Sequence, residues 1–314
     1  MSTSGVPRDV APSLAEDPQT VRLALREALA RATRRLGEAG IVSASAEARS
    51  LLGAAADCTG PLVLLDALPA DFAERLEELV ARREAHEPLQ LILGSAPFRR
   101  LELETAPGVF IPRPETEVAI DVLLEHAREE RVTTVVDLCT GSGAIAAAVL
   151  DEAPAARVIA VEIDAAARDL AARNLARIAS GRAEVRAGDV TDPDLLGDLT
   201  EVDAVLANPP YIPSGAIPRD REVTDHDPAR ALYGGGEDGL DIPRAVVALA
   251  ARLLRDGGLL VMEHADVQGA AAREVAAATG AFRAIRTVRD LTGRDRFLVA
   301  VREITGRPHH EMRD

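Results

Sequence analysis

The tetrapeptide Asn208-Pro209-Pro210-Tyr211 combines residue types that could hold a planar amino group. It follows an apolar run, 202–207, which predicts a buried parallel strand that ends at Asn208. The two prolines fix φ and remove N–H donors, and the first keeps Asn208 out of the α region. The result would be a stiff platform with one amide, backbone carbonyls and an aromatic face. A strand-terminating turn is the plainer interpretation, because Asn and Pro are common turn residues.

A second candidate is the turn Asp137-Leu138-Cys139-Thr140-Gly141-Ser142-Gly143, between a predicted strand and a predicted helix. Glycines let a ligand approach the backbone, and a helix N-terminus can bind phosphate. A dinucleotide fingerprint needs a third glycine, but Ala146 stands at its position. The acid Asp137 would repel a pyrophosphate and could hold an ammonium group. This pattern favours a ligand with an amino-acid end, such as S-adenosylmethionine, although a plain turn is the alternative.

Two further acids follow the next predicted strands. Glu162 ends the second strand, where an acid can accept hydrogen bonds from ribose hydroxyls. Asp189 follows the third strand and could accept from an adenine amino group, with Val190 against the ring. A helix-capping acid and a turn aspartate are the alternative roles. Because the carboxyl ends of parallel strands face one crevice, we expect these residues to meet there with the turn and the tetrapeptide.

The elements that must position these residues alternate along the second half of the chain. Predicted strands lie at 132–138, 158–161, 183–186, 202–207 and 258–262, and predicted helices at 143–150, 165–178, 242–254 and 268–278. Two final extended runs, 282–288 and 296–301, predict a hairpin that turns at Thr292-Gly293. The alternation is typical of a doubly wound, mostly parallel α/β sheet of the Rossmann-like kind.

The first third of the chain shows only helical periods. Leu25, Leu29, Ala32 and Leu36 predict one helix, and similar stripes follow to about residue 93. Short apolar runs around Ala106-Pro107-Gly108 predict a β-hairpin. We therefore expect a loose arm at 1–18, a helical substrate-docking domain at 19–95, a hairpin linker at 96–113, an α/β domain at 114–304 and a tail at 305–314.

Composition argues against several functions. The net charge is -15, which disfavours direct contact with nucleic acid, since phosphates attract basic surfaces. Cys58 and Cys139 lie far apart, and the six histidines have no metal-ligand spacing, so we expect no disulfide and no metal. No apolar run reaches membrane length, and the N-terminus lacks the apolar core of a signal peptide. We expect a cytoplasmic monomer without membrane contact.

Taken together, the motifs resemble those of the protein-(glutamine-N5) methyltransferases that modify peptide-chain release factors. The matching segments are Phe110-Ile-Pro-Arg-Pro-Glu-Thr-Glu117, Asp137 to Gly143, Asn208-Pro-Pro-Tyr-Ile-Pro213 and Gly235-Gly-Glu-Asp-Gly-Leu-Asp241, within a similarity from about 19 to 303. The resemblance implies S-adenosyl-L-methionine as cofactor and the glutamine of a Gly-Gly-Gln loop in a release factor as substrate. It would make 114–304 a methyltransferase domain. The family usually has glycine at Cys139, and Glu-Pro where this chain has Asp227-Pro228.

The resemblance also assigns the site. The expected cofactor-binding residues are Asp137, Cys139, Thr140, Gly141, Ser142, Gly143, Glu162, Asp189, Val190 and Asn208. The expected substrate-binding residues are Asn208, Pro209, Pro210 and Tyr211, of which Asn208, Pro209 and Tyr211 would be catalytic. By hypothesis, the Asn208 oxygen and the Pro209 carbonyl accept the two N–H bonds of the substrate amide, and Tyr211 packs on its plane. The loop 213–239, with the candidate acid–base pair Asp225 and His226, would cover the crevice.

Three other functions stay open. Asn-Pro-Pro-Tyr is shared with amino methyltransferases of nucleic acids, such as those acting on adenine N6, but the chain is acidic and lacks a basic or aromatic recognition region. A protein that binds the cofactor without chemistry would not need the tetrapeptide. A nicotinamide-dependent oxidoreductase is disfavoured by the missing third glycine.

Overall fold

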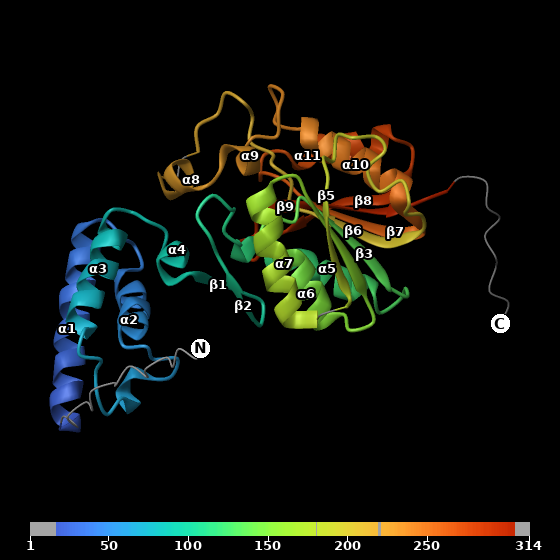
Figure 1. Ribbon diagram of the computed structural model, residues 1–314. Coiled ribbons are helices and arrows are strands. Elements are labelled where there is room, and N and C mark those ends of the chain that lie inside the picture. Colours follow the sequence, from blue (N-terminus) through green and yellow to red (C-terminus); the bar gives the residue numbers. More distant parts are fainter. Residues whose placement is uncertain (1–16, 180, 219–220, 305–314) are drawn as a thin grey trace, which may run out of the picture. The chain divides into compact units, whose positions relative to one another are not determined.

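The computed structural model describes residues 17–179, 181–218 and 221–304. The arm predicted at 1–18 lies outside these ranges except for its last two residues. The tail predicted at 305–314 lies outside them completely. The chain divides into two compact units after Leu93 (Figure 1), and each is described by itself.

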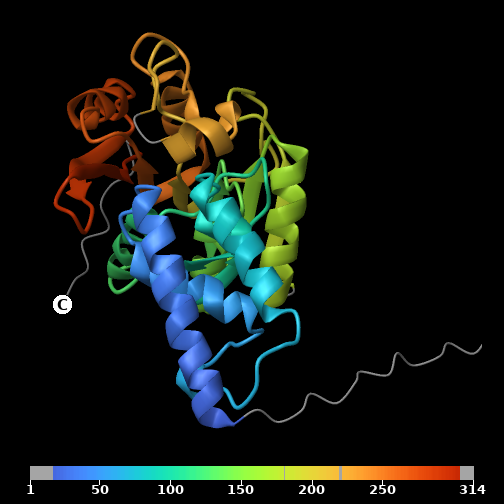
Figure 2. The ribbon, with the colours of Figure 1, turned by 90° about the vertical axis from the view of Figure 1, so that its left-hand side faces the viewer.

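The N-terminal unit is a helical bundle of α1 (Pro18–Glu38), α2 (Ala44–Ala55), the 3-10 turn η1 (Leu62–Leu64), α3 (Phe72–Glu84) and α4 (Leu89–Leu93). The three longer helices lie side by side in both views (Figures 1 and 2). Helix α1 begins at Pro18 because proline suits the first helical turn, and the Asp17 carboxylate accepts from the Gln19 N–H at 3.3 Å. The predicted stripe of α1 is confirmed, with Leu25, Ala32 and Leu36 in the core and Leu29 at its edge.

The C-terminal unit contains a seven-stranded sheet in the order β5-β4-β3-β6-β7-β9-β8. Its strands are β3 (Thr134–Leu138), β4 (Arg157–Glu162), β5 (Ala183–Ala187), β6 (Val202–Ala207), β7 (Leu254–Glu263), β8 (Phe282–Arg289) and β9 (Asp295–Arg302). Strands β5, β4, β3, β6 and β7 are parallel, and β9 and β8 form the predicted antiparallel hairpin. The predicted doubly wound, Rossmann-like sheet is confirmed.

Helices cover both faces of this sheet, because its central strands are apolar on both sides. One face carries α5 (Val118–His126), α6 (Ala144–Glu152) and α7 (Ala165–Ala179), and the other carries α10 (Asp241–Leu253) and α11 (Gly269–Ala278) (Figure 1). Val135 packs into the first layer and its neighbour Val136 into the second. The site residues at the strand ends are therefore held by a core on each side.

The strand order reverses between β3 and β6, which is where open α/β sheets bind their ligands. The chain continues from β3 to β4 and β5 on one side and from β6 to β7 on the other. Leu138, near the end of β3, pairs with Ala207, the last residue of β6. The glycine-containing turn and the tetrapeptide thus leave the sheet from adjacent positions.

A hairpin is present in the predicted segment 96–113, but the prediction that it turns at Pro107-Gly108 is wrong. The hairpin consists of β1 (Ser95–Phe98) and β2 (Leu101–Glu104) and turns at Arg99-Arg100. It belongs to the C-terminal unit, where Phe98 and Leu103 enter the core. Arg99 adopts a left-handed φ of 56°, while its guanidinium pairs with Glu152 at 2.8 Å. These long-range contacts fix the turn, and no local sequence signal reveals them.

The segment 213–239, predicted as a loop, contains two short helices, α8 (Arg221–His226) and α9 (Ala229–Leu232). Its glycine-rich end lies directly against the tetrapeptide. A Cβ on Gly234 would lie 2.5 Å from the Pro210 carbonyl oxygen, and a Cβ on Gly239 would lie 2.2 Å from the Tyr211 carbonyl oxygen. Only glycine permits this approach of two backbones. The turn at 234–239 therefore packs directly against the backbone of the tetrapeptide.

We expect Gly239→Ala to destabilise the C-terminal unit by roughly 3 kcal/mol, because the added methyl group meets backbone and the φ of this residue is left-handed. Denaturant unfolding would measure the loss. Gly215→Ala is the matched control, since a Cβ there meets nothing within 4 Å. Equal stability of the two variants would contradict the close contact.

Candidate active site

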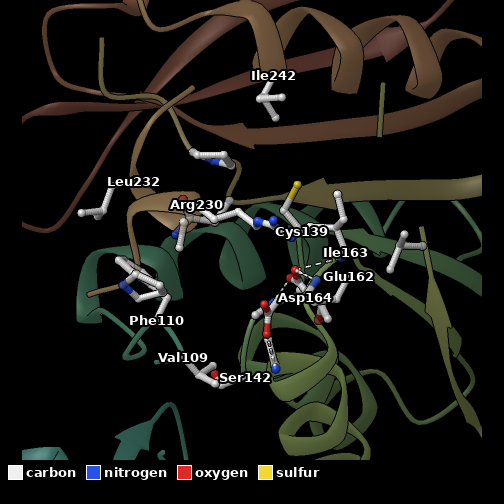
Figure 3. Close-up of a pocket in the computed structure, with 18 of the residues that line it drawn as sticks. Val109, Phe110, Cys139, Ser142, Glu162, Ile163, Asp164, Arg230, Leu232 and Ile242 are labelled. Carbon is white, nitrogen blue, oxygen red and sulfur yellow. Dashed lines mark hydrogen bonds between the residues drawn. The ribbon is translucent and has the colours of Figure 1, made fainter. Parts of the chain in front are cut away.

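A cavity of about 410 Å³ opens at the carboxyl ends of β3, β4 and β6. A volume of this size suits a small-molecule ligand. Figure 3 shows Cys139, Ser142 and Glu162 on one side of it and Arg230 and Leu232 on another. Its wall is formed by residues from 108–116, 139–145, 161–167, 188–191, 208–212 and 228–233. The predicted crevice therefore gathers the turn, the acids and the tetrapeptide in one place.

The glycine-containing turn presents Cys139, Thr140, Gly141 and Ser142 to the cavity. Cys139 has a φ of 59°, in the left-handed region that glycine adopts without strain. This backbone explains why glycine is the usual residue here in the family that the sequence resembles. Burial raises the pKa of the Cys139 thiol well above its ordinary value, and nearby acids add to the effect. Burial thus favours the neutral thiol, which is a poor nucleophile.

Asp137 and Gly143 are buried behind the turn and do not line the cavity. The Asp137 carboxylate accepts from the Thr140 hydroxyl and from the Ala146 N–H at 3.1 Å, which ties the turn to the start of α6. Burial raises the pKa of Asp137 to about 7. The expected contact of Asp137 with a ligand ammonium group therefore has no support in this geometry. A Cβ on Gly143 would lie 3.2 Å from Ala171, so this glycine serves the packing of α6 on α7.

Glu162 lies at the cavity with its carboxylate held by backbone donors (Figure 3). One oxygen accepts from the N–H groups of Ile163 at 2.9 Å and Asp164 at 3.0 Å, and the other accepts from the Gly141 N–H at 2.9 Å. The second oxygen can accept one more hydrogen bond, since each carboxylate oxygen offers about two lone pairs. This geometry suits the predicted role of Glu162 toward a ribose hydroxyl.

Asp189 and Val190 also line the cavity, as expected for contacts with an adenine. Asp189 accepts from the Thr191 N–H at 2.9 Å and the Thr191 hydroxyl at 2.7 Å, and these bonds lower its pKa. The charge of Arg230 lowers that pKa further. Arg230, which sequence analysis missed, extends from α9 into the cavity (Figure 3). Only the folding of 213–239 over the strand ends brings this arginine there.

In the tetrapeptide, Asn208, Pro210 and Tyr211 line the cavity, whereas Pro209 is buried and does not. The Asn208 Nδ2 donates to the Thr116 hydroxyl at 3.2 Å, and the Tyr211 hydroxyl donates to Glu263 at 3.2 Å. Burial raises the pKa of Tyr211, so its hydroxyl stays protonated. The predicted contact through the Pro209 carbonyl stays a prediction that the lining of the cavity does not support.

Thr116 and Glu263 are two buried polar residues next to the tetrapeptide that sequence analysis missed as site residues, and Thr116 also lines the cavity. The Thr116 hydroxyl donates to Glu263 at 2.6 Å, and Glu263 is 3% exposed. Burial raises the pKa of Glu263 to about 7, while Thr116 and Arg296 act in the opposite direction. One signal could have identified Glu263, because it ends β7 beside β6, as Glu162 ends β4 beside β3.

The covering segment is joined to residues 110–117 by an ion pair. Arg113 lies over the Phe110 ring at 5.1 Å and donates to Asp227 at 2.6 Å, and the Asp227 side chain is 1% exposed. Asp227 therefore anchors the segment that contributes Arg230. Neither Asp225 nor His226 lines the cavity, so the geometry gives no support to an acid–base pair there.

His264 is fully buried beside Glu263, and its Nδ1 lies 2.7 Å from the Ala265 carbonyl oxygen. This placement indicates a structural role for His264. Among the described residues, no group of three or more His, Cys, Asp or Glu could hold a metal ion. Within the same ranges, no helix has the length and apolar character needed to cross a membrane.

Comparisons with known proteins agree with this geometry. Residues 27–94 match the model of the PrmC N-terminal domain, and residues 100–220 match the model of the methyltransferase small domain. Proteins named release factor glutamine methyltransferase share 46% identity in Mycolicibacterium smegmatis and 47% in Streptomyces coelicolor. These alignments cover 85% and 77% of this chain and 93% and 85% of the relatives. The chain belongs to the family of release factor glutamine methyltransferases.

As a member of this family, the chain is a methyltransferase that uses S-adenosylmethionine as methyl donor. The residues that line the cavity suit the charges of this cofactor. Glu162, Asp164 and Asp189 supply negative charge for a ligand that carries a sulfonium and an ammonium group, and Val190 supplies an apolar wall. The family name does not favour a nucleic acid as the methyl acceptor.

We expect Glu162→Gln to weaken S-adenosylmethionine binding by about 10- to 100-fold, because a hydrogen bond to a charged acceptor is lost at the cavity. Titration calorimetry on the methyltransferase would measure the Kd. Glu184→Gln is the matched control, since the Glu184 carboxylate pairs with Arg157 and Arg186 outside the cavity. An unchanged Kd in Glu162→Gln would refute the assignment.

Asp137 predicts a pH dependence of stability. Its pKa of about 7 in the folded chain exceeds the ordinary 3.8, so the protonated carboxyl stabilises the fold at low pH. This stabilisation is lost as pH rises toward 7. Between about pH 5.5 and about pH 8, the free energy of unfolding of the wild type should decrease. We expect this decrease to be smaller by roughly 2 kcal/mol in Asp137→Asn. Denaturant unfolding at both pH values measures it, and parallel pH curves for variant and wild type would contradict it.

Proposed function

We propose that this methyltransferase transfers the methyl group of S-adenosylmethionine to the side-chain nitrogen of the glutamine in a Gly-Gly-Gln loop of a peptide-chain release factor. One observation carries the proposal. Asn208 and the turn Cys139 to Ser142 line the same cavity, at the ends of strands that pair through Leu138 and Ala207. Neighbouring strands lie about 4.8 Å apart, so a carboxamide held at Asn208 is within reach of a methyl group held at the turn.

The residues of the tetrapeptide would position the substrate amide. A primary amide is a weak nucleophile because its lone pair is delocalised, so orientation has to supply much of the rate enhancement. The Asn208 side-chain oxygen accepts one amide N–H and directs the nitrogen toward the methyl group. The Tyr211 ring lies beside the amide plane, and its hydroxyl bond to Glu263 keeps the ring in place. When bound, S-adenosylmethionine supplies the activated methyl group.

The proton of the amide needs no strong base before transfer, because methylation itself acidifies the nitrogen. A mechanism without a dedicated base agrees with the lining of the cavity, which includes neither Asp225 nor His226. Developing positive charge on the nitrogen would be stabilised by the Asn208 oxygen dipole and by the acids of the cavity. The methyltransferase therefore works by positioning and electrostatics.

The remaining parts of the proposal concern the partner. Relatives named release factor glutamine methyltransferase support a protein substrate, and the net charge of -15 argues against direct contact with nucleic acid. We assign the helical domain, 19–95, to docking of the release factor. We expect a cytoplasmic monomer, because the substrate acts in translation and one chain forms the cavity.

We expect Asn208→Ala to lower kcat by about 100-fold or more, because it removes the acceptor that orients the amide, while S-adenosylmethionine still binds. Mass spectrometry of a release factor incubated with enzyme and cofactor would report the methyl group on its Gly-Gly-Gln glutamine. A release factor with alanine in place of that glutamine is the control and should stay unmethylated. Near-normal turnover by Asn208→Ala, or methylation of nucleic acid in a parallel reaction, would overturn the proposal.

A further inference from the structure

We infer that Thr116 and Glu263 fix the orientation of the Asn208 carboxamide, so that its oxygen faces the substrate and its nitrogen faces the protein. This inference rests on the proposed function, in which the Asn208 oxygen must accept an N–H from glutamine. It makes Thr116 and Glu263 positioning residues, which act through Asn208. Their chain of hydrogen bonds joins three elements, the 3-10 turn η2 (Pro114–Glu117), the end of β6 and the end of β7.

The chain of donors and acceptors has only one consistent direction when Glu263 is ionised. Its two oxygens then only accept, one from Thr116 at 2.6 Å and the other from Tyr211 at 3.2 Å. Thr116 donates its single hydroxyl proton to Glu263. Toward Asn208, 3.2 Å away, the Thr116 oxygen can therefore only accept. The Asn208 group that faces it must be the Nδ2 amine, which leaves the carbonyl oxygen for the cavity.

This constraint matters because an asparagine side chain is nearly symmetric in shape. Rotation by a half turn exchanges its oxygen and nitrogen with little change in packing. In the wrong orientation, Asn208 would present two donors to the N–H groups of the substrate amide, and donors facing donors repel. A buried carboxylate is energetically unfavourable. The function of the Glu263 carboxylate would be to select one of the two orientations of the Asn208 side chain, which packing alone does not distinguish.

Protonation of Glu263 would release the constraint. A neutral carboxyl group can donate its own proton to Tyr211 or Thr116, so the Thr116 hydroxyl can then donate to Asn208. The charged and titratable groups that act on Glu263 are Arg296 on β9, Glu115 on η2 and Tyr211 after β6. Burial and Glu115 raise the pKa of Glu263 and Arg296 lowers it, with a resulting value of about 7. Activity should therefore fall as pH decreases through this value.

The test compares Thr116→Val with Thr116→Ser. Valine keeps the shape but removes the hydroxyl, whereas serine keeps the hydroxyl. We expect Thr116→Val to lower kcat/KM for the release factor by about 100-fold with an unchanged Kd for S-adenosylmethionine, and Thr116→Ser to retain most of the activity. The fall in kcat/KM below about pH 7 should persist in the serine variant and vanish in the valine variant. A role limited to folding would not move the pH profile.

A second measurement separates this inference from the proposed function. Neutron diffraction from the full chain distinguishes the Asn208 oxygen from its deuterated nitrogen without any substrate. We expect the oxygen to face the cavity well above the pKa of Glu263, in wild type and in Thr116→Ser. The nitrogen in that place, or full activity of Thr116→Val, would overturn the inference. Failure of wild type to methylate any release factor would overturn the proposed function and leave the neutron result standing as the test of orientation.

Discussion

The pairing of β3 with β6 is the constraint on which the rest of the site depends. These two strands run parallel at the point where strand order reverses, with Leu138 opposite Ala207. Each strand ends in a segment that cannot continue the sheet, a glycine-containing turn in one case and a proline pair in the other. The glycine-containing turn and the tetrapeptide are neighbours for this reason. Burial on both faces keeps the two strands, and hence the two segments, in fixed register.

Much of this arrangement could be predicted from the sequence because strand ends in a parallel sheet share one edge. Apolar runs located the central strands, and the residues after them then had to lie together. Glu162, Asp189 and Asn208 were found in this way, and all three line the cavity. The same logic applied to the fifth parallel strand would have found Glu263.

The differences between expectation and structure have physical causes of another kind. Pro107-Gly108 does form a turn, in which the Val109 N–H donates to the Ala106 carbonyl at 3.2 Å. The hairpin turns earlier, at Arg99, which pairs with the distant residues Asp121 and Glu152. Asp137 has the right position in the motif, but its side chain points into the protein, toward Thr140 and Ala146. Side-chain direction at a strand end depends on what fills the space behind the turn. A single sequence does not contain that information in local form.

Two buried acids give the site its internal order. Asp137 accepts hydrogen bonds from the glycine-containing turn, and Glu263 accepts from Thr116 and Tyr211 beside the tetrapeptide. Burial raises the pKa of each acid to about 7. Burying a carboxyl group is unfavourable unless hydrogen bonds compensate. In both cases the bonds are made to groups whose orientation the site requires. The two buried acids therefore lower the stability of the fold near neutral pH, while their hydrogen bonds fix the geometry of the site.

The glycine turn at 234–239 limits how the platform could be redesigned. The Pro210 and Tyr211 carbonyl groups lie against glycine backbone, and no side chain stands between the two segments that could be shortened. An engineer who wants to admit a bulkier acceptor cannot deepen the recess from the rear. New space has to come from other parts of the wall, such as the stacked pair Phe110 and Arg113, so changes in acceptor size are best sought at those two positions.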